Sequence, residues 1–274
     1  MTRFRSTLGI ACLCLGLGAG NQADASTIVT LLLEDFEDAN VAYTLSNGPA
    51  ADGEAYFTRM GGTGGSTLPG SSDYGTPNGT GGTPSAGGGF FAAQSTNIGE
   101  AGLDFDSATM TFSGIDISGA AAGTLQFSGL FSEDDRVTED WDANTSVRAE
   151  ASLDGGAFFQ IFRIESSNGN DSAPAVDTDF NGTGDGTIIS DSFVTFTAAI
   201  AGAGNLLSLR IIFENLNGSG KDIAFDDITL TGMTPMPPVI GTPEPSSVML
   251  LGGLALCGGG YHLRRRRRQH ASAA

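Results

Sequence analysis

The chain of 274 residues carries 31 acidic and 13 basic side chains, a formal net charge of −18, and 41 glycines, which argue against a helical protein because glycine weakens helices. Region 26–240, which lies between two terminal segments described below, keeps six cations against 29 acids and has neither Cys nor His. Its net charge of −23 argues against nucleic-acid binding. Because the region lacks Cys and His, it cannot form a Ser–His–Asp triad, a cysteine nucleophile or a His-ligated zinc site.

The first 25 residues have the features of a secretory signal peptide. Arg3 and Arg5 supply a basic start, residues 8–19 are mainly apolar, and small residues at 23 and 25 match the positions that a signal peptidase reads. About a dozen apolar residues are too few for a helix to span a bilayer core of roughly 30 Å, which argues against a membrane anchor. We therefore expect cleavage before Ser26 and export across the inner membrane.

From residue 26 onward, short strand patterns follow one another with turn residues between them and no convincing helix. Residues 47–89 are rich in Gly, Ser, Thr and Pro, and predict long, disordered loops around one short strand. These patterns predict an all-β fold, a single antiparallel β-sandwich of the jelly-roll type over residues 26–233. The predicted strands are 27–36, 55–59, 90–94, 108–113, 123–131, 146–153, 158–165, 193–200, 206–214 and 223–231.

The C-terminal segment combines a stiff linker with a short apolar stretch and a basic end. Residues 234–245 contain five prolines and predict an extended linker. An apolar stretch at 248–263 is marginal for a membrane span, and a basic tail at 264–274 would hold that end on the cytoplasmic side. A plain tail anchor is one interpretation. The residues that define the segment are Pro243, Glu244, Pro245, Arg264, Arg265, Arg266, Arg267 and Arg268.

Residues 243–268 resemble the PEP-CTERM sorting signal, in which a Pro-Glu-Pro triplet, a short hydrophobic transmembrane helix and an arginine cluster follow in this order. The resemblance implies processing by an exosortase-type sorting enzyme, after a signal peptidase has acted at the other end. It also implies a Gram-negative bacterium that makes extracellular polysaccharide, with the protein anchored in the inner membrane, transiently or finally, or placed at the cell surface or in the matrix.

One acidic loop has the spacing of a calcium-binding loop. Asp177, Asp179, Asn181 and Asp185 place oxygen ligands at positions one, three, five and nine, and Gly182 permits the tight turn between them. Position twelve lacks the bidentate Glu of an EF-hand and no helices flank the loop, so the pattern predicts a Ca²⁺ loop inside a β protein. A solvated acidic turn is the alternative.

A second group of acids is divided between the two ends of the region. Phe36-Glu37 near its start and Asp226-Asp227 near its end resemble the paired motifs of MAM-type extracellular domains and bacterial carbohydrate-binding modules. The resemblance implies that the first and last strands lie together and that Glu37 and Asp227, with Asp35 and Asp226 as further candidates, hold a structural Ca²⁺. The alternative is a set of acids at exposed strand ends.

The only tryptophan, Trp141, lies among acids and is a candidate for stacking on a sugar ring, although a packing anchor is the commoner role. Carboxylate pairs suited to glycoside hydrolysis arise by chance among 29 acids, so we predict no enzyme activity. The sequence predicts a non-catalytic cell-surface or matrix protein, stabilised by calcium and associated with exopolysaccharide. The alternatives are a carbohydrate-binding module that recognises extracellular polysaccharide and a self-assembling adhesin.

Overall fold

The computed structural model describes residues 26–52, 55–65, 88–100, 102–133, 141–217 and 221–235, apart from the side chains of Glu100 and Pro235. The predicted signal peptide, the sorting segment 243–268 with its apolar stretch, and residues 66–87 of the Gly-rich region lie outside these ranges. Within them, every regular element is a β-strand, so a search of these residues for an apolar helix of membrane-spanning length returns none.

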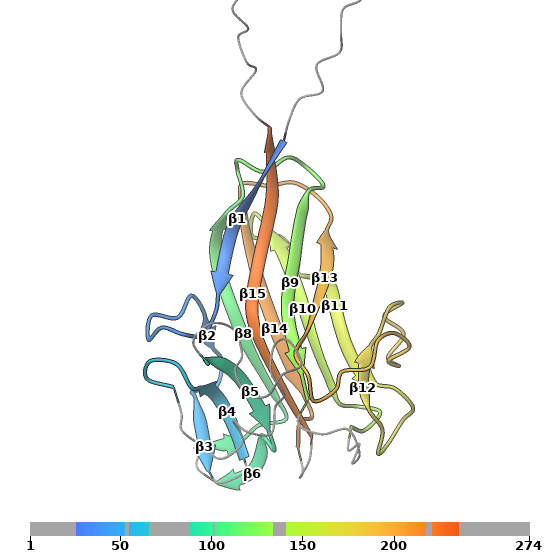
Figure 1. Ribbon diagram of the computed structural model, residues 1–274. Helices are drawn as coiled ribbons and strands as arrows, with labels where there is room; N and C mark the ends of the chain where they lie inside the picture. Colours follow the sequence, from blue (N-terminus) through green and yellow to red (C-terminus); the bar gives the residue numbers. More distant parts are fainter. Residues whose placement is uncertain are drawn as a thin grey trace, which may run out of the picture. The chain divides into compact units, whose positions relative to one another are not determined.

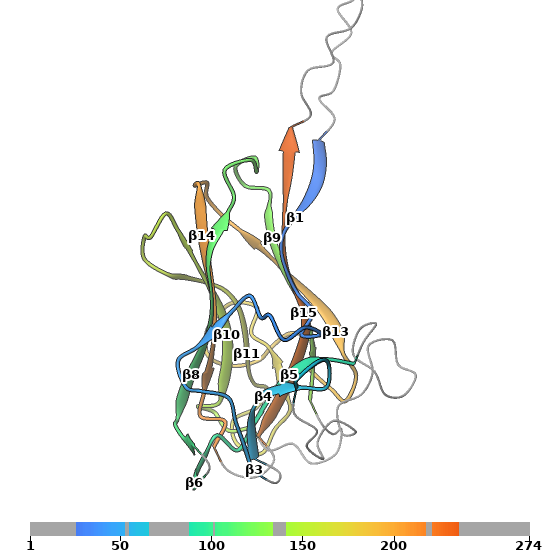
Figure 2. The same ribbon diagram turned by 90° about the vertical axis from the view of Figure 1, so that its left-hand side faces the viewer.

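The strands form two sheets that pack face to face as a sandwich, with every pair antiparallel (Figures 1 and 2). The seven-stranded sheet has the order β13-β9-β15-β5-β4-β3, with β1 also paired to β15. Its strands are β1 (Ser26–Glu34), β3 (Ala50–Asp52), β4 (Ala55–Met60), β5 (Phe90–Gln94), β9 (Leu125–Ser132), β13 (Val194–Ile200) and β15 (Asp222–Pro235).

The six-stranded sheet has the order β12-β11-β10-β14-β8-β2, and a separate two-stranded hairpin joins β6 to β7. The strands of the six-stranded sheet are β2 (Thr44–Leu45), β8 (Ser107–Asp116), β10 (Ser146–Leu153), β11 (Phe159–Ser166), β12 (Pro174–Val176) and β14 (Leu206–Glu214). The hairpin strands are β6 (Asn97–Glu100) and β7 (Leu103–Asp104).

The predicted all-β sandwich is confirmed, and each of the ten predicted strands is present. The five strands that sequence patterns missed, β2, β3, β6, β7 and β12, have two to four residues each, too few for apolar alternation to show. The segment 47–89 contains its predicted short strand as β4, in which Phe57 and Met60 are fully buried, and also the missed strand β3. Strand β15 continues two residues beyond the predicted domain end at 233.

The long strand β15 organises the seven-stranded sheet. Strand β9 pairs along one of its edges, while β5 and then β1 share the other edge. The change from β5 to β1 occurs at Asp226 and Asp227, and Asp227 has a φ of 48°. The predicted contact between the first and last strands is thereby confirmed, with Ser26 opposite Pro235.

The core between the sheets is rich in phenylalanine. The rings of Phe91 and Phe213 both stack on Phe225, with centroids 5.2 and 5.7 Å away, and Phe36 meets Phe225 edge-on at 5.6 Å. All four side chains are at most 2% exposed. Because burial of one such side chain is worth about 1.5–3 kcal/mol, these rings are a main source of stability for the sandwich.

Side chains of β10, β11 and β14 that face away from the core form an ion-pair ladder. The guanidinium group of Arg148 pairs with Glu214 and, at 3.0 Å, with Glu150, while Arg210 reaches Glu150 at 2.6 Å. Arg163 pairs with Glu165, and both residues lie on β11, the strand beside β10. The ladder therefore places three of the region's six cations on one sheet face.

Replacing Glu214 with Gln is expected to lower stability at neutral pH by about 0.5–1 kcal/mol, since the pair is partly exposed. The hydrogen bond from Arg148 lowers the pKa of Glu214 below its ordinary value of 4.5. The stabilising contribution of the Arg148–Glu214 pair is thus fully present above pH 4.5. It is lost as the pH falls through the lower pKa that Glu214 has in the folded state. Urea unfolding of both proteins from pH 7 to pH 3 measures the difference, with Asp52→Asn as the charge-matched control. A deficit that does not shrink as the pH falls below 4.5 would contradict this account.

Candidate functional site

The predicted calcium loop begins where β12 ends. Asp177 is fully buried, and its backbone N–H donates to the carbonyl oxygen of Arg163 on β11 at 3.0 Å, which fixes the start of the loop. Its carboxylate accepts the backbone N–H groups of Asn181 at 3.2 Å and Gly182 at 2.9 Å. A buried carboxylate therefore organises the turn, and Gly182 supplies the φ of 92° that the turn requires.

The loop gathers three of the four predicted ligands. One carboxylate oxygen from each of Asp177, Asp179 and Asp185 lies within 4.8 Å of the other two. Two oxygens that bind one Ca²⁺ at about 2.4 Å lie at most about 4.8 Å apart, so the three carboxylates could serve a single ion. The fourth predicted ligand, Asn181, donates from Nδ2 to Asp179 at 3.0 Å, and its Oδ1 accepts the N–H of Thr183 at 3.0 Å.

Charges around this loop are only partly compensated. Hydrogen bonds from the backbone N–H and the hydroxyl of Thr178, both 2.8 Å, lower the pKa of Asp185. Beneath the loop, burial raises the pKa of Glu165; Arg163 opposes this shift, and the nearby charge of Asp177 adds to it. Like charges thus accumulate between the loop and the sheet, and a bound divalent cation would relieve their repulsion.

The second predicted calcium group comes together where β1 and β5 meet β15. Burial raises the pKa of Asp227, and the charges of Asp35 and Glu37 raise it further, which places these three acids in one electrostatic neighbourhood. Glu37 accepts the backbone N–H of Gly89 at 2.9 Å. In the described ranges, the loop of Asp177 is the one place where three acids lie within reach of a single ion. Calcium binding by Glu37 and Asp227 stays a prediction.

Close backbone packing fixes this second group. Arg59 donates to the carbonyl oxygens of Phe36 at 3.3 Å and Thr63 at 2.6 Å. A Cβ atom at Gly89 would lie 2.3 Å from the carbonyl oxygen of Phe36, and one at Gly62 would lie 2.7 Å from the same oxygen. The segment 36–37 is therefore held by an arginine on one side and by glycines that no larger residue could replace without movement.

The variant Gly89→Ala is expected to lose about 1–3 kcal/mol of stability, because there is no room for the added methyl group beside the backbone atoms of Phe36. Gly48→Ala is the matched control, since a Cβ there meets no atom within 4 Å, and its effect should stay within about 0.5 kcal/mol. Guanidinium chloride unfolding compares the two. Equal effects would show that segment 36–37 is not held as tightly as described.

Of the two roles considered for Trp141, its position agrees with the packing anchor and corrects the candidate sugar contact. The side chain is fully buried in the main core, and its indole N–H donates to the carbonyl oxygen of Asp222 at 3.2 Å. Its backbone forms an isolated bridge to Ser172. A ring with no exposed face cannot stack on a sugar, so Trp141 is a packing anchor whose one polar atom is satisfied.

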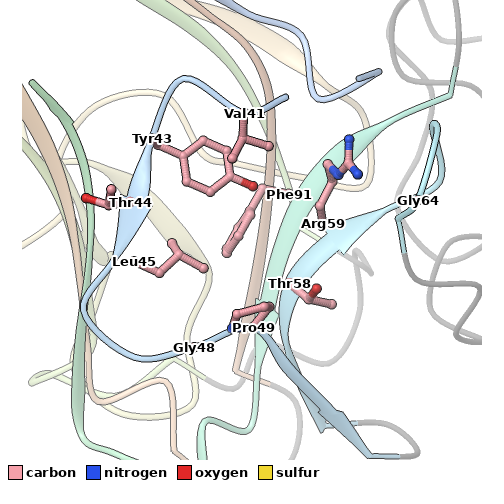
Figure 3. A pocket seen from close by; sticks show the side chains of 10 residues that line it. All are labelled: Val41, Tyr43, Thr44, Leu45, Gly48, Pro49, Thr58, Arg59, Gly64 and Phe91. Carbon is pink, nitrogen blue, oxygen red and sulfur yellow. The ribbon is translucent and has the colours of Figure 1, made fainter. Parts of the chain in front are cut away.

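A pocket of about 440 Å³ lies where the segment that carries β2 faces β4 (Figure 3). No sequence pattern predicted this pocket, because its walls come from three separate stretches of the chain. Its lining residues are Val41, Tyr43, Thr44, Leu45, Gly48, Pro49, Thr58, Arg59, Gly64 and Phe91.

No protein-family model matches the chain, and no curated protein matches it. Three solved structures with partly similar folds are a cyclase from Fischerella, an adhesin domain of Lys-gingipain from Porphyromonas gingivalis, and a family 11 carbohydrate-binding module of a Clostridium thermocellum cellulase. Their sequence identities are 14%, 15% and 12%, and their TM-scores are 0.40, 0.36 and 0.33. The matches cover 81%, 74% and 77% of this chain and 93%, 97% and 96% of the others. Likenesses this distant carry no functional inference.

Proposed function

We propose that the chain is an exported, non-catalytic protein of the cell surface or extracellular matrix, sorted through its C-terminal signal and stabilised by calcium among extracellular polysaccharide. The observation that carries this proposal is the loop after β12, where three carboxylates lie within reach of one ion. The sorting signal at 243–268 supports the location through its resemblance to exosortase substrates.

Calcium suits this loop for two reasons. Ca²⁺ prefers six to eight oxygen ligands, and the loop supplies carboxylates from Asp177, Asp179 and Asp185, with room for waters because two of the three residues are exposed. Region 26–240 also carries a net charge of −23, and a divalent cation lowers the repulsion that opposes a compact fold. In this proposal, calcium fixes loop structure and takes no part in a reaction.

Export and sorting are tested in a Gram-negative host that carries an exosortase, by comparing the full chain with a chain that ends at Thr242. The full chain is expected in the envelope and matrix fractions, where a chelator would release part of it, and the truncated chain in the culture medium. Replacing the five arginines with glutamines, while keeping the apolar stretch, separates sorting from simple anchoring. The same distribution for all three chains would contradict the proposal.

A further inference from the structure

The pocket described above has two walls of different chemistry. The segment 41–49 contributes the apolar side chains of Val41, Leu45 and Pro49, with Phe91 of β5 behind them. Strand β4 contributes Thr58 and Arg59 on the opposite side, and the Tyr43 hydroxyl points toward that strand (Figure 3). Its volume of about 440 Å³ lies within the range of roughly 300–1,000 Å³ that is usual for small-molecule sites.

Arg59 is the unusual group in this pocket. The residue is only 8% exposed, yet no carboxylate of the described residues forms an ion pair with it. Two of its five N–H groups donate to the carbonyl oxygens of Phe36 and Thr63, and the other three have no acceptor among the same residues. Because buried charges in proteins are normally paired, this guanidinium group is prepared for an anion.

The carboxylate of Glu34, which interacts electrostatically with Arg59, does not fill this role. Glu34 influences Arg59, but the carboxylate oxygens of Glu34 accept the backbone N–H groups of Phe36 at 3.1 Å and Ala42 at 2.6 Å. Burial raises the pKa of Glu34, and the charge of Arg59 opposes this shift. The positive charge of Arg59 is therefore not fully balanced by a carboxylate of the described residues.

Hydroxyl groups complete the polar side. Burial, and then the nearby charge of Glu34, raise the pKa of Tyr43, so its hydroxyl stays protonated and can donate. In the part of the chain that the structure describes, no hydrogen bond uses the hydroxyls of Tyr43 and Thr58. The side chain of Thr44 points away from the pocket (Figure 3). The pocket thus offers one cation, two hydroxyls and an aliphatic–aromatic wall.

We propose that this pocket binds a hexuronate residue of an acidic polysaccharide, with the sugar carboxylate on Arg59, its hydroxyls on Tyr43 and Thr58, and its C–H face against Val41 and Leu45. A planar guanidinium group matches a carboxylate through paired hydrogen bonds, and the hydroxyls match a polyol better than an aliphatic acid. The inference rests on the proposed association with polysaccharide and names the sugar class for it.

The negative charge of the whole region does not exclude an acidic ligand. At physiological ionic strength the Debye length is about 8 Å, so most of the acids are screened from a ligand in this pocket. A guanidinium group that is 8% exposed is screened much less, and its contact with the ligand decides the outcome.

The test is calorimetric titration of the purified full-length protein with three probes, a trigalacturonate, the neutral galactotriose of similar size, and hexanoate as a carboxylate that is not a sugar. The trigalacturonate is expected to bind about 10- to 100-fold more tightly than either of the other probes, as loss of a charge-assisted hydrogen bond implies. Equal binding of the neutral sugar, tighter binding of hexanoate, or no binding of trigalacturonate would each overturn the proposal.

Two variants locate the binding. Gly48→Trp adds an indole at the pocket wall where a Cβ meets no atom within 4 Å, so the fold should survive while trigalacturonate affinity falls at least about tenfold. Leu206→Trp, at a residue that is 50% exposed and outside the pocket lining, is the matched control and should bind as the parent does. Arg59→Lys keeps the positive charge but loses the planar guanidinium group that can donate two parallel hydrogen bonds. It should therefore also weaken trigalacturonate binding.

If Gly48→Trp and Leu206→Trp bind trigalacturonate with equal affinity and both keep the parent's unfolding midpoint, the uronate binds elsewhere. That result would overturn the proposal that it binds in this pocket. This failure is distinguishable from failure of the proposed function. Chelator-sensitive retention in the matrix fraction tests the proposed function alone, and it could persist in Gly48→Trp while trigalacturonate binding is lost.

Discussion

Addition of millimolar calcium to the purified chain is expected to raise its thermal unfolding midpoint markedly. A ligand at about a thousand times its dissociation constant stabilises the native state by about 4 kcal/mol. For a domain of this size class, each kcal/mol shifts the midpoint by about 2–4 °C, so the expected rise is about 8–16 °C. Differential scanning calorimetry in calcium and in excess chelator measures it.

The variants Asp177→Asn and Asp185→Asn should remove most of this rise, because each takes a carboxylate from the only described group of three acids within reach of one ion. Asp104→Asn, at an exposed position on β7, changes the net charge equally and should keep the full rise. If the midpoint is the same in calcium and in chelator, calcium has no part in the stability of this fold. If Asp104→Asn loses the rise as well, the effect is general charge screening.

Trp141→Ala is expected to cost about 3–5 kcal/mol, among the largest losses that a single substitution in this core can cause. The side chain is 0% exposed, so its removal leaves a large cavity, and the carbonyl oxygen of Asp222 loses the indole N–H. Urea unfolding at pH 7 measures the change from the transition midpoint and slope.

Trp141→Phe separates packing from hydrogen bonding. It retains much of the ring but lacks the indole N–H, so its loss should be smaller, about 1–3 kcal/mol. A loss below about 1 kcal/mol for Trp141→Ala would contradict the buried position and reopen the question of sugar stacking at this residue.

The strands were predictable because their information is local. In β10, Val147, Ala149 and Ala151 alternate with polar residues, and the structure places these three side chains in the core. A three-residue strand such as β12 has no such period, and its pairing with β11 depends on neighbours that are distant in sequence. Length of element, more than composition, decided which strands could be found.

The candidate sites divide in the same way. Asp177, Asp179 and Asp185 could be predicted together because one short loop carries all three. The ion-pair ladder and the pocket depend on register and on the approach of separate segments, as where Arg210 on β14 meets Glu150 on β10. For Trp141 both a packing anchor and a sugar contact stayed open, because acidic neighbours in sequence do not reveal that a ring points into the core.

The adjacency of Ser26 and Pro235 has a mechanical consequence (Figure 1). A pull on the chain at Pro235 acts along β15, the strand whose two edges are shared by β9, β5 and β1. If the opposite end of the sandwich is held, many backbone hydrogen bonds are strained in parallel and none can open one after another. A force applied to the sandwich at Pro235 would therefore act on its best-connected strand, β15, and the sandwich would resist being pulled apart from this end.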